Sequence, residues 1–212
     1  MIWNKKPVAS SLVRQLNEQY GIDMITASIM ARREITSAEQ VKFLVEKELT
    51  WLHNPFLFDD METVVERILD ARTEGERVRI YGDRDVDGIT STALLHLELS
   101  TLGIDVSHRL PEGDEPYGLS RNGVDEAHQD GVTLIITVDS GISNIDEISW
   151  ARELGIDVIV LDHHIGGESL PPAIAIINPK LAGSGYPFEH LAGVGVVAKV
   201  IWALRYAQTP FY

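Results

Sequence analysis

Short apolar runs alternate with helical patterns along the second part of the chain. Runs with the length and β-branched content of buried strands fall at 77–82, 104–109, 133–138, 157–161 and 174–177. Helical spacing of apolar positions falls near 90–102, 121–130 and 143–154, and returns over 191–207. Strands that alternate with helices are typical of βαβ units. The pattern therefore predicts an α/β fold, with a parallel sheet of roughly five strands flanked by helices.

The first part of the chain has a helical pattern instead. Helix start or stop signals lie at Ser10, Gly21, Ser37, Asp59 or Asp60, and Gly75. Between them, apolar residues recur at helical spacing, without the short runs that mark strands. We therefore expect a helical N-terminal region over 1–75 and an α/β domain over 76–212.

Composition limits the class of protein. The chain has 212 residues, 44% of them hydrophobic, and no cysteine. It can therefore bury a sizeable core, but it can form neither a disulfide nor a thiolate metal site. No apolar stretch approaches the roughly 20 residues that span a bilayer, and the N-terminus does not resemble a signal peptide. We expect a cytoplasmic protein without a membrane partner.

The charge is strongly acidic and unevenly distributed. The chain has 18 basic and 32 acidic side chains, which gives a net charge of -14. Residues 81–212 carry 7 of the basic and 19 of the acidic side chains. Attraction to nucleic acid needs a basic face, which this balance does not offer. Either the partner is small, or cations lie among the carboxylates, or a basic surface belongs to a part of the protein outside these residues.

Acidic residues follow three of the predicted strands. Asp83, Asp139 and Asp162 come after the first, third and fourth strands. The carboxyl ends of parallel strands share one edge of a sheet, where ligands bind. The neighbours that would join them there are Asp85, Asp87, His163 and His164. The sequence therefore predicts a crevice with five carboxylates and two imidazoles.

Such a cluster would repel itself unless a cation neutralised it, since unit charges about 4 Å apart interact by about 4 kcal/mol at an effective dielectric near 20. Carboxylate and imidazole without thiolate suit Mn²⁺ well, with Mg²⁺ or Co²⁺ as alternatives. Two ions about 3.5–4 Å apart would clamp a phosphate, generate hydroxide and stabilise the leaving oxygen. We therefore expect a two-metal phosphoesterase site.

Other interpretations explain less of the pattern. One aspartate after a buried strand is more often a helix cap than a ligand, but several together reverse that preference. An EF-hand loop starting at Asp83 would need Glu where Leu94 stands. The segment Asp85–Thr90 resembles the nucleophile motif of haloacid-dehalogenase-type phosphatases. Its register is shifted by one, because Ile89 replaces the expected Thr.

Four segments stand in a specific order along the chain: Tyr81–Leu95 (YGDRDVDGITSTALL), Val138–Ile142 (VDSGI), Val160–His164 (VLDHH) and Leu191–Val196 (LAGVGV). Together they resemble successive motifs of the DHH phosphoesterase family. Their order and spacing are most similar to the single-stranded-DNA-specific exonuclease branch of that family, and the helical leader resembles that branch too. The resemblance implies metal-dependent phosphodiester hydrolysis on single-stranded DNA, from the 5′ end, in repair and recombination.

The resemblance also implies roles for individual residues. Metal ligands would be Asp83, Asp85, Asp87, Asp139 and His163, with Asp139 bridging two Mn²⁺ ions. His164 would lie near the scissile phosphate, and Asp162 would orient the histidines without binding the metal. Arg109 is the nearest candidate for an arginine that contacts the DNA phosphate near the 5′ end. All of these except Asp162 and Arg109 are expected to be catalytic.

The chain departs from the family pattern in three places. Arg84 stands where an aromatic residue is usual, and we expect it to offset charge rather than to bind substrate. The segment from Arg109 to Tyr117 is longer than usual. A further aspartate ligand is expected beyond the helix that begins after Gly195, so the domain over 76–212 looks truncated before its last metal motif.

These departures leave two alternatives to the exonuclease interpretation. The acidic balance favours a phosphatase of oligonucleotides or small phosphoesters in the same superfamily. The missing ligand favours a partial module without catalysis. We expect exonuclease activity in the full-length protein, which would bind single-stranded DNA, and weak or no activity in these 212 residues alone.

Overall fold

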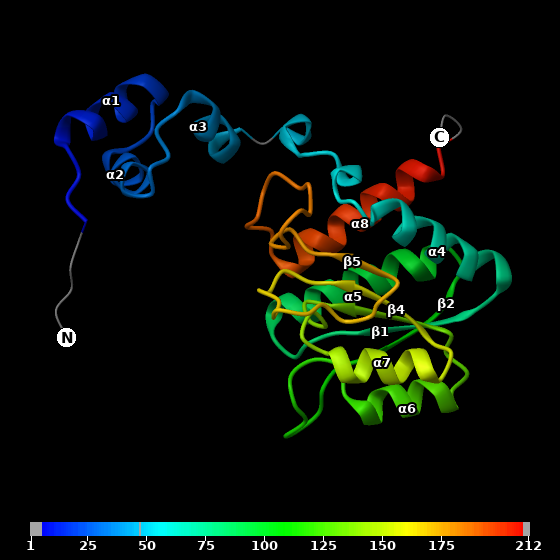
Figure 1. Ribbon diagram of the computed structural model, residues 1–212. Coiled ribbons are helices and arrows are strands. Elements are labelled where there is room, and N and C mark those ends of the chain that lie inside the picture. The colour runs from blue at the N-terminus through cyan, green and yellow to red at the C-terminus, as the bar shows by residue number, and fades with distance from the viewer. Residues whose placement is uncertain (1–5, 47, 210–212) are drawn as a thin grey trace. The chain divides into compact units, whose positions relative to one another are not determined.

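The computed structural model describes residues 6–46 and 48–209. The chain divides into two compact units, residues 1–52 and 53–212, and each is described by itself (Figure 1). Among the described residues, no helix is both long and apolar enough to cross a membrane.

The N-terminal unit is helical, as its sequence pattern predicts. It contains α1 (Ser10–Tyr20), α2 (Met24–Arg32), α3 (Ala38–Val45) and the 3₁₀ turn η1 (Leu49–Trp51). Gly21 ends α1 in the left-handed conformation, and Ser37 caps α3 in a capping box with Gln40. Both signals are confirmed. Ser10 is the first residue of α1 and provides no side-chain cap.

The α/β unit contains a five-stranded, wholly parallel sheet in the order β2-β1-β3-β4-β5. Its elements are η2 (Pro55–Leu57), α4 (Met61–Glu74), β1 (Arg77–Tyr81), α5 (Val86–Thr101), β2 (Asp105–Arg109), α6 (Arg121–Gln129), β3 (Leu134–Val138), α7 (Ile145–Glu153), β4 (Asp157–Leu161), β5 (Ala175–Ile177) and α8 (Gly193–Ala207). The predicted α/β fold with a five-stranded parallel sheet is confirmed.

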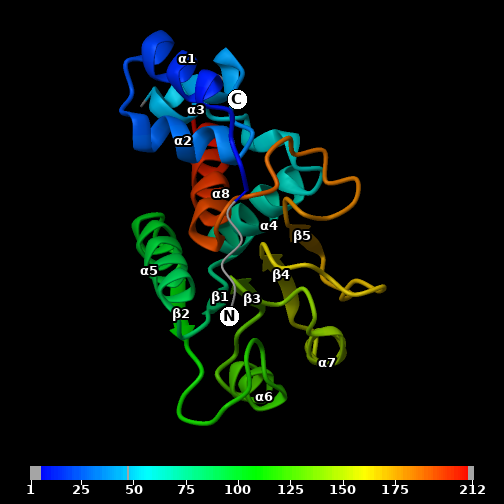
Figure 2. The same ribbon diagram turned by 90° about the vertical axis from the view of Figure 1, so that its left-hand side faces the viewer.

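Helices cover both faces of this sheet. Helices α4, α5 and α8 lie on one face, and α6 and α7 lie on the other (Figure 2). All five residues of the central strand β3 are buried, because its side chains enter both cores. A strand buried on both faces has the continuous apolar run from which it was predicted.

Helix α4 belongs to the α/β unit rather than to the N-terminal helices with which the sequence pattern grouped it. Its apolar face, including Val64 and Ile68, is buried in the same core as β1 and α8. Asp60 precedes α4, but its side chain does not cap the helix. The carboxylate instead accepts a 2.8 Å hydrogen bond from the backbone N–H of Ile176, in β5. Helical periodicity alone could not show this, because it does not identify the partner of an apolar face.

Helix α5 begins at Val86, four residues earlier than the sequence pattern predicts. Asp85 is its N-cap, and the Asp85 carboxylate accepts a 2.9 Å hydrogen bond from the N–H of Gly88. Gly88 is required because a Cβ there would lie 2.5 Å from the carbonyl oxygen of Asp83. The early start places Asp87 in the first turn of α5, next to the sheet edge.

We predict that Asp60→Ala destabilises the α/β unit by about 1–2 kcal/mol, since it removes a charged acceptor from the edge strand β5. The measurement is the urea midpoint, with an unchanged slope. Asp59→Ala is the matched control, because Asp59 is the exposed neighbouring carboxylate. Equal effects of the two variants would show that the bond to Ile176 does not stabilise β5.

Candidate metal centre

The carboxyl ends of β1, β3 and β4 meet at one edge of the sheet, and an aspartate follows each strand. Asp83 lies two residues after β1, whereas Asp139 and Asp162 directly follow β3 and β4. The chain passes from β1 to β2 on one side and then to β3 on the other. A crevice for ligands forms at such a switch in strand order. Asp83 and Asp139 flank this switch.

Asp139 is the most constrained residue at this edge. Its φ is +56°, which is uncommon outside glycine, and the residue is only 1% exposed. Its Oδ1 accepts no hydrogen bond from the described residues. Burial, then the charges of Asp87 and Asp85, raise the pKa of the Asp139 carboxyl to about 7. A cation bound here would stabilise the charged form that burial and the neighbouring carboxylates disfavour.

Asp83, Asp85 and Asp139 form the first group of side chains that could hold a metal. One carboxylate oxygen from each lies within 4.8 Å of the others. Asp83 is buried, and its Oδ1 also lacks a hydrogen-bond partner among the described residues. Asp85 is exposed, so the group opens to solvent on one side. Three carboxylates whose oxygens lie this close together are suited to a hard divalent cation.

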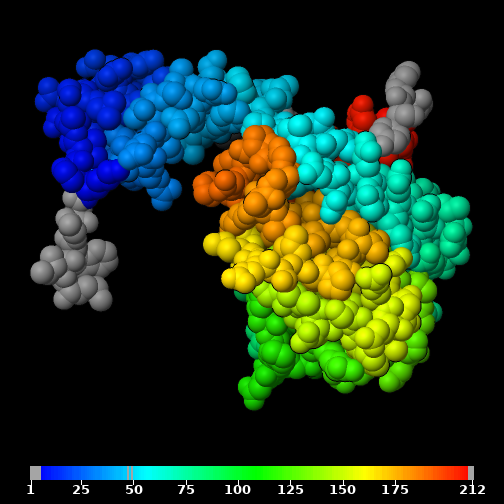
Figure 3. Space-filling model, viewed as in Figure 1, coloured from blue at the N-terminus to red at the C-terminus, as the bar shows by residue number. Residues whose placement is uncertain are grey.

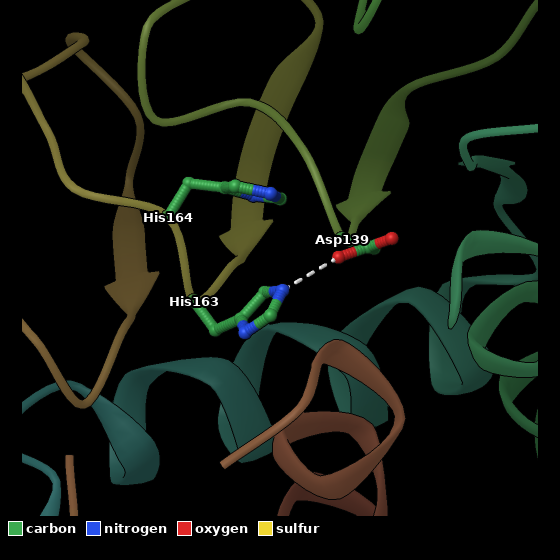
Figure 4. Close-up of side chains that lie close together, drawn as sticks. All are labelled: Asp139, His163 and His164. Atoms are coloured by element: carbon green, nitrogen blue, oxygen red, sulfur yellow. Dashed lines mark ion pairs between the residues drawn. The ribbon is translucent and has the colours of Figure 1, made fainter. Parts of the chain in front are cut away.

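Asp139 also belongs to a second group, with His163 and His164, whose ligand atoms lie within 4.8 Å of one another. Figure 4 shows His163 pointing toward Asp139, with its Nε2 3.0 Å from Oδ1. The Nδ1 of His163 lies 3.0 Å from the carbonyl oxygen of Leu191, so this nitrogen carries a proton and donates it. Its Nε2 faces Oδ1 of Asp139, an arrangement in which a proton or a bound cation would lie between the two atoms.

Asp162 holds both histidines. Its buried carboxylate accepts hydrogen bonds from the N–H of His163 (2.7 Å), the N–H of His164 (3.1 Å) and the N–H of Ile142 (3.0 Å). The Nδ1 of His164 lies 2.8 Å from the same carboxylate. Asp162 therefore joins the turn after β4 to the turn after β3. It lies outside both groups that could hold a metal, as the resemblance implies for a residue that orients the histidines.

Asp87 lies near the two groups but has different partners. Its two carboxylate oxygens accept hydrogen bonds from the N–H of Gly193 (2.7 Å) and the N–H of Val194 (2.8 Å). These donors lie in the first turn of α8, which carries a partial positive charge. A Cβ at Gly193 would lie 2.8 Å from Oδ1 of Asp139. Asp87 therefore holds the glycine against Asp139, although its Oδ2 is also 3.5 Å from Nε2 of His163.

The two arginines that the sequence analysis considered do not join the carboxylate cluster. The guanidinium of Arg109 pairs with Glu115 (2.8 Å) and with Glu126 (2.7 Å). These hydrogen bonds raise the pKa of Arg109 and hold the pKa of Glu115 well below its usual range. Arg84 donates to the backbone carbonyls of Gly113 and Glu115. Both arginines therefore hold the segment between β2 and α6.

The structure adds residues that the sequence analysis did not assign. Tyr117 donates a hydrogen bond to the backbone carbonyl of Asp139 and touches the ring of His164. The side-chain amide of Asn178 donates a 2.9 Å hydrogen bond to the carbonyl of His164. Residue spacing carries no signal for such contacts, because they join loops after different strands. The one feature of the sequence that pointed to this loop was the unusual length of the segment from Arg109 to Tyr117.

The donors at this edge fit a divalent metal. The two groups supply carboxylate oxygens and imidazole nitrogens, and they share Asp139. Two of the carboxylate oxygens are buried without a hydrogen bond from the described residues. This donor set suits Mn²⁺ and Mg²⁺ better than a thiophilic metal.

The fold and this centre define a class of protein. The family model described as "DHH family, N-terminal domain" matches residues 77–211. The chain belongs to the DHH family. Two of the segments that carry the resemblance begin at the ends of strands and continue into the turns after them. They are Val138–Ile142, at the end of β3, and Val160–His164, at the end of β4.

The chain is also similar to individual proteins. The chain is 37% identical over 205 residues to the single-stranded-DNA-specific exonuclease RecJ of Bacillus subtilis (strain 168), covering 96% of this chain and 26% of that protein. It is 42% identical over 179 residues to RecJ of Escherichia coli (strain K12), covering 84% and 30%. A crystal structure of exonuclease RecJ bound to manganese superposes with a TM-score of 0.65 and 35% identity, covering 72% of this chain and 39% of that one. The chain spans less than a third of the length of these two curated relatives.

We predict that Asp139→Asn stabilises the metal-free protein. The raised pKa means that the native state disfavours the charged Asp139 carboxylate, so this residue costs stability as the pH rises from about 4 through about 7. Asn removes the charge and tolerates the positive φ. The melting temperature should exceed that of the parent, by roughly 2–4 °C per kcal/mol of repulsion relieved, and the gap should shrink at acidic pH.

The control for this prediction is Asp114→Asn, because Asp114 is an exposed carboxylate in a loop. It should leave the melting temperature nearly unchanged at every pH. Adding Mn²⁺ should raise the melting temperature of the parent more than that of Asp139→Asn. A metal-free Asp139→Asn protein that melts below the parent at about pH 8 would contradict the repulsion at this site.

Proposed function

We propose that this chain is the catalytic DHH part of a metal-dependent phosphodiesterase that acts as a 5′ to 3′ exonuclease on single-stranded DNA, in the cytoplasm, in repair and recombination. The observation that carries the proposal is that Asp139 is shared by two groups of side chains able to hold a metal. The substrate class is supported by the likeness to RecJ, which is named for single-stranded DNA.

The proposed metals are two Mn²⁺ ions, with Mg²⁺ as an alternative. Asp83, Asp85 and Asp139 would hold one, and Asp139 with His163 the other. A bound divalent ion would supply a Lewis acid for the phosphate and lower the pKa of a bound water. The manganese-bound RecJ structure supports this choice of ion.

The remaining side chains would prepare the site for a phosphodiester. His164 is about half exposed, and its Nδ1 is engaged by Asp162, so its Nε2, which has only a 3.5 Å contact with the Tyr117 hydroxyl, would meet a phosphate oxygen or the leaving group. We propose that Asp87 holds the start of α8 in place, in addition to any contact with a metal, because both of its carboxylate oxygens accept hydrogen bonds from that helix. The net charge of -14 would be offset by bound cations and by basic surfaces elsewhere in a longer protein.

The first test is metal binding by calorimetry. We expect Asp85→Asn and His163→Ala to weaken Mn²⁺ binding by about 10-fold or more, since each removes a proposed ligand. Asn is chosen at 85 because it can still cap α5. The matched control is Asp114→Asn, which should bind as the parent does. Parent-like affinity in both site variants would contradict the proposed metal centre.

The second test separates the exonuclease from the small-substrate phosphatase that the acidic balance favours. With Mn²⁺, a long 5′-phosphorylated single strand and a dinucleotide are compared as substrates, using this chain and the same chain extended by the regions that RecJ relatives carry. We expect faster cleavage of the long strand and an increase on extension. Preference for the dinucleotide would favour the phosphatase, and metal binding without turnover in either chain would favour a non-catalytic module.

A further inference from the structure

The segment between β2 and α6 runs from Arg109, the last residue of β2, to Ser120, the N-cap of α6, and its tip projects from the α/β unit (Figure 3). Within it, Tyr117 is 53% exposed. Its hydroxyl nevertheless reaches the metal-holding groups and lies 2.5 Å from the backbone carbonyl oxygen of Asp139.

The loop is fixed on both sides of Tyr117. Before it, Arg84 donates to two loop carbonyls and Arg109 pairs with Glu115. After it, the side chain of Asn144 accepts a 3.2 Å hydrogen bond from the N–H of Leu119 and donates a 3.0 Å one to the carbonyl of that residue. These anchors reach the loop from the turn after β1, the end of β2 and the start of α7. The position of the Tyr117 ring is therefore determined by the surrounding fold.

The hydroxyl of Tyr117 has one proton, and the carbonyl of Asp139 takes it. Toward Nδ1 of His164, 3.1 Å away, the hydroxyl oxygen can only accept. Nδ1 also faces the Asp162 carboxylate at 2.8 Å. Both neighbours thus require a proton on Nδ1, whereas Nε2 lies farther from the same hydroxyl, at 3.5 Å.

The same hydroxyl acts on Asp139. A non-glycine residue at φ +56° persists only where its surroundings hold it. The hydrogen bond from Tyr117 fixes the carbonyl of Asp139, and the peptide N–H of Asp139 donates a 2.9 Å hydrogen bond to the carbonyl of Leu161. With both backbone groups held, the Asp139 carboxylate keeps its direction toward Asp83 and His163.

We propose that Tyr117 is a positioning residue for the metal centre: its hydroxyl fixes the left-handed backbone of Asp139 and the ring of His164 together. This role rests on the proposed metal-dependent function, but it concerns side-chain geometry that exists without metal. It also explains why Arg84 and Arg109 serve the loop, since their hydrogen bonds keep Tyr117 over the site.

The test is Tyr117→Phe, which keeps the ring and removes only the hydroxyl. Heteronuclear NMR that distinguishes the two ring nitrogens reports the proton position of His164 in the metal-free chain. We expect the parent to hold the proton on Nδ1; in the variant the Asp162 carboxylate keeps it there, but the ring-nitrogen signals of His164 shift because the contact with the hydroxyl is lost. Mn²⁺ affinity, measured by calorimetry, should fall by about 10-fold, with little change in melting temperature.

The matched control is Tyr81→Phe. The Tyr81 hydroxyl contacts Ser120 and Arg109, at the ends of the same loop, but neither Asp139 nor His164. It should leave the His164 signals and the Mn²⁺ affinity unchanged. If Tyr117→Phe leaves the His164 signals as in the parent, the proposal is overturned. If the His164 signals shift but the parent itself binds no Mn²⁺, the positioning role stands and the metal-dependent function fails.

Discussion

Mutual repulsion among carboxylates at one edge of the sheet is the constraint on which this structure depends. Asp83 and Asp139 are buried at the switch in strand order, with Asp85 and Asp87 close by. Like charges a few ångströms apart in a partly desolvated site cost several kcal/mol unless donors or cations compensate. The surrounding elements meet this cost in two ways. Some carboxylates receive backbone hydrogen bonds. Others have a buried oxygen without a hydrogen-bond partner among the described residues, where a cation could bind.

The carboxylates that receive hydrogen bonds organise the fold around the site. Asp162 accepts from the turns after β3 and β4, and Asp87 accepts from the first turn of α8. Asp60 does the same for the edge strand β5, on another part of the unit. Each joins segments that are distant in sequence. The buried oxygens without a hydrogen-bond partner among the described residues belong to Asp83 and Asp139. Asp85 has both roles, because it caps α5 and also belongs to a group that could hold a metal.

The sequence predicts the sheet and the convergence of its aspartates because both follow from local patterns. Apolar runs mark strands, and parallel strands bring their carboxyl ends to one edge. It cannot distinguish Asp87 from Asp85, because both stand in one motif and differ only in which segment of chain approaches them. Tyr117 and the packing of α4 are hidden for the same reason. These features are tertiary contacts between segments whose spacing in sequence carries no periodicity.

The central claim is that Asp139 is shared by two metal sites. Electron paramagnetic resonance during a Mn²⁺ titration tests it directly, because two ions about 3.5–4 Å apart couple magnetically. The account predicts that the signal of isolated Mn²⁺ gives way to that of a coupled pair as the second ion binds, and that Asp139→Asn abolishes the coupling. A parent protein that binds one ion only, or two uncoupled ions, would contradict it.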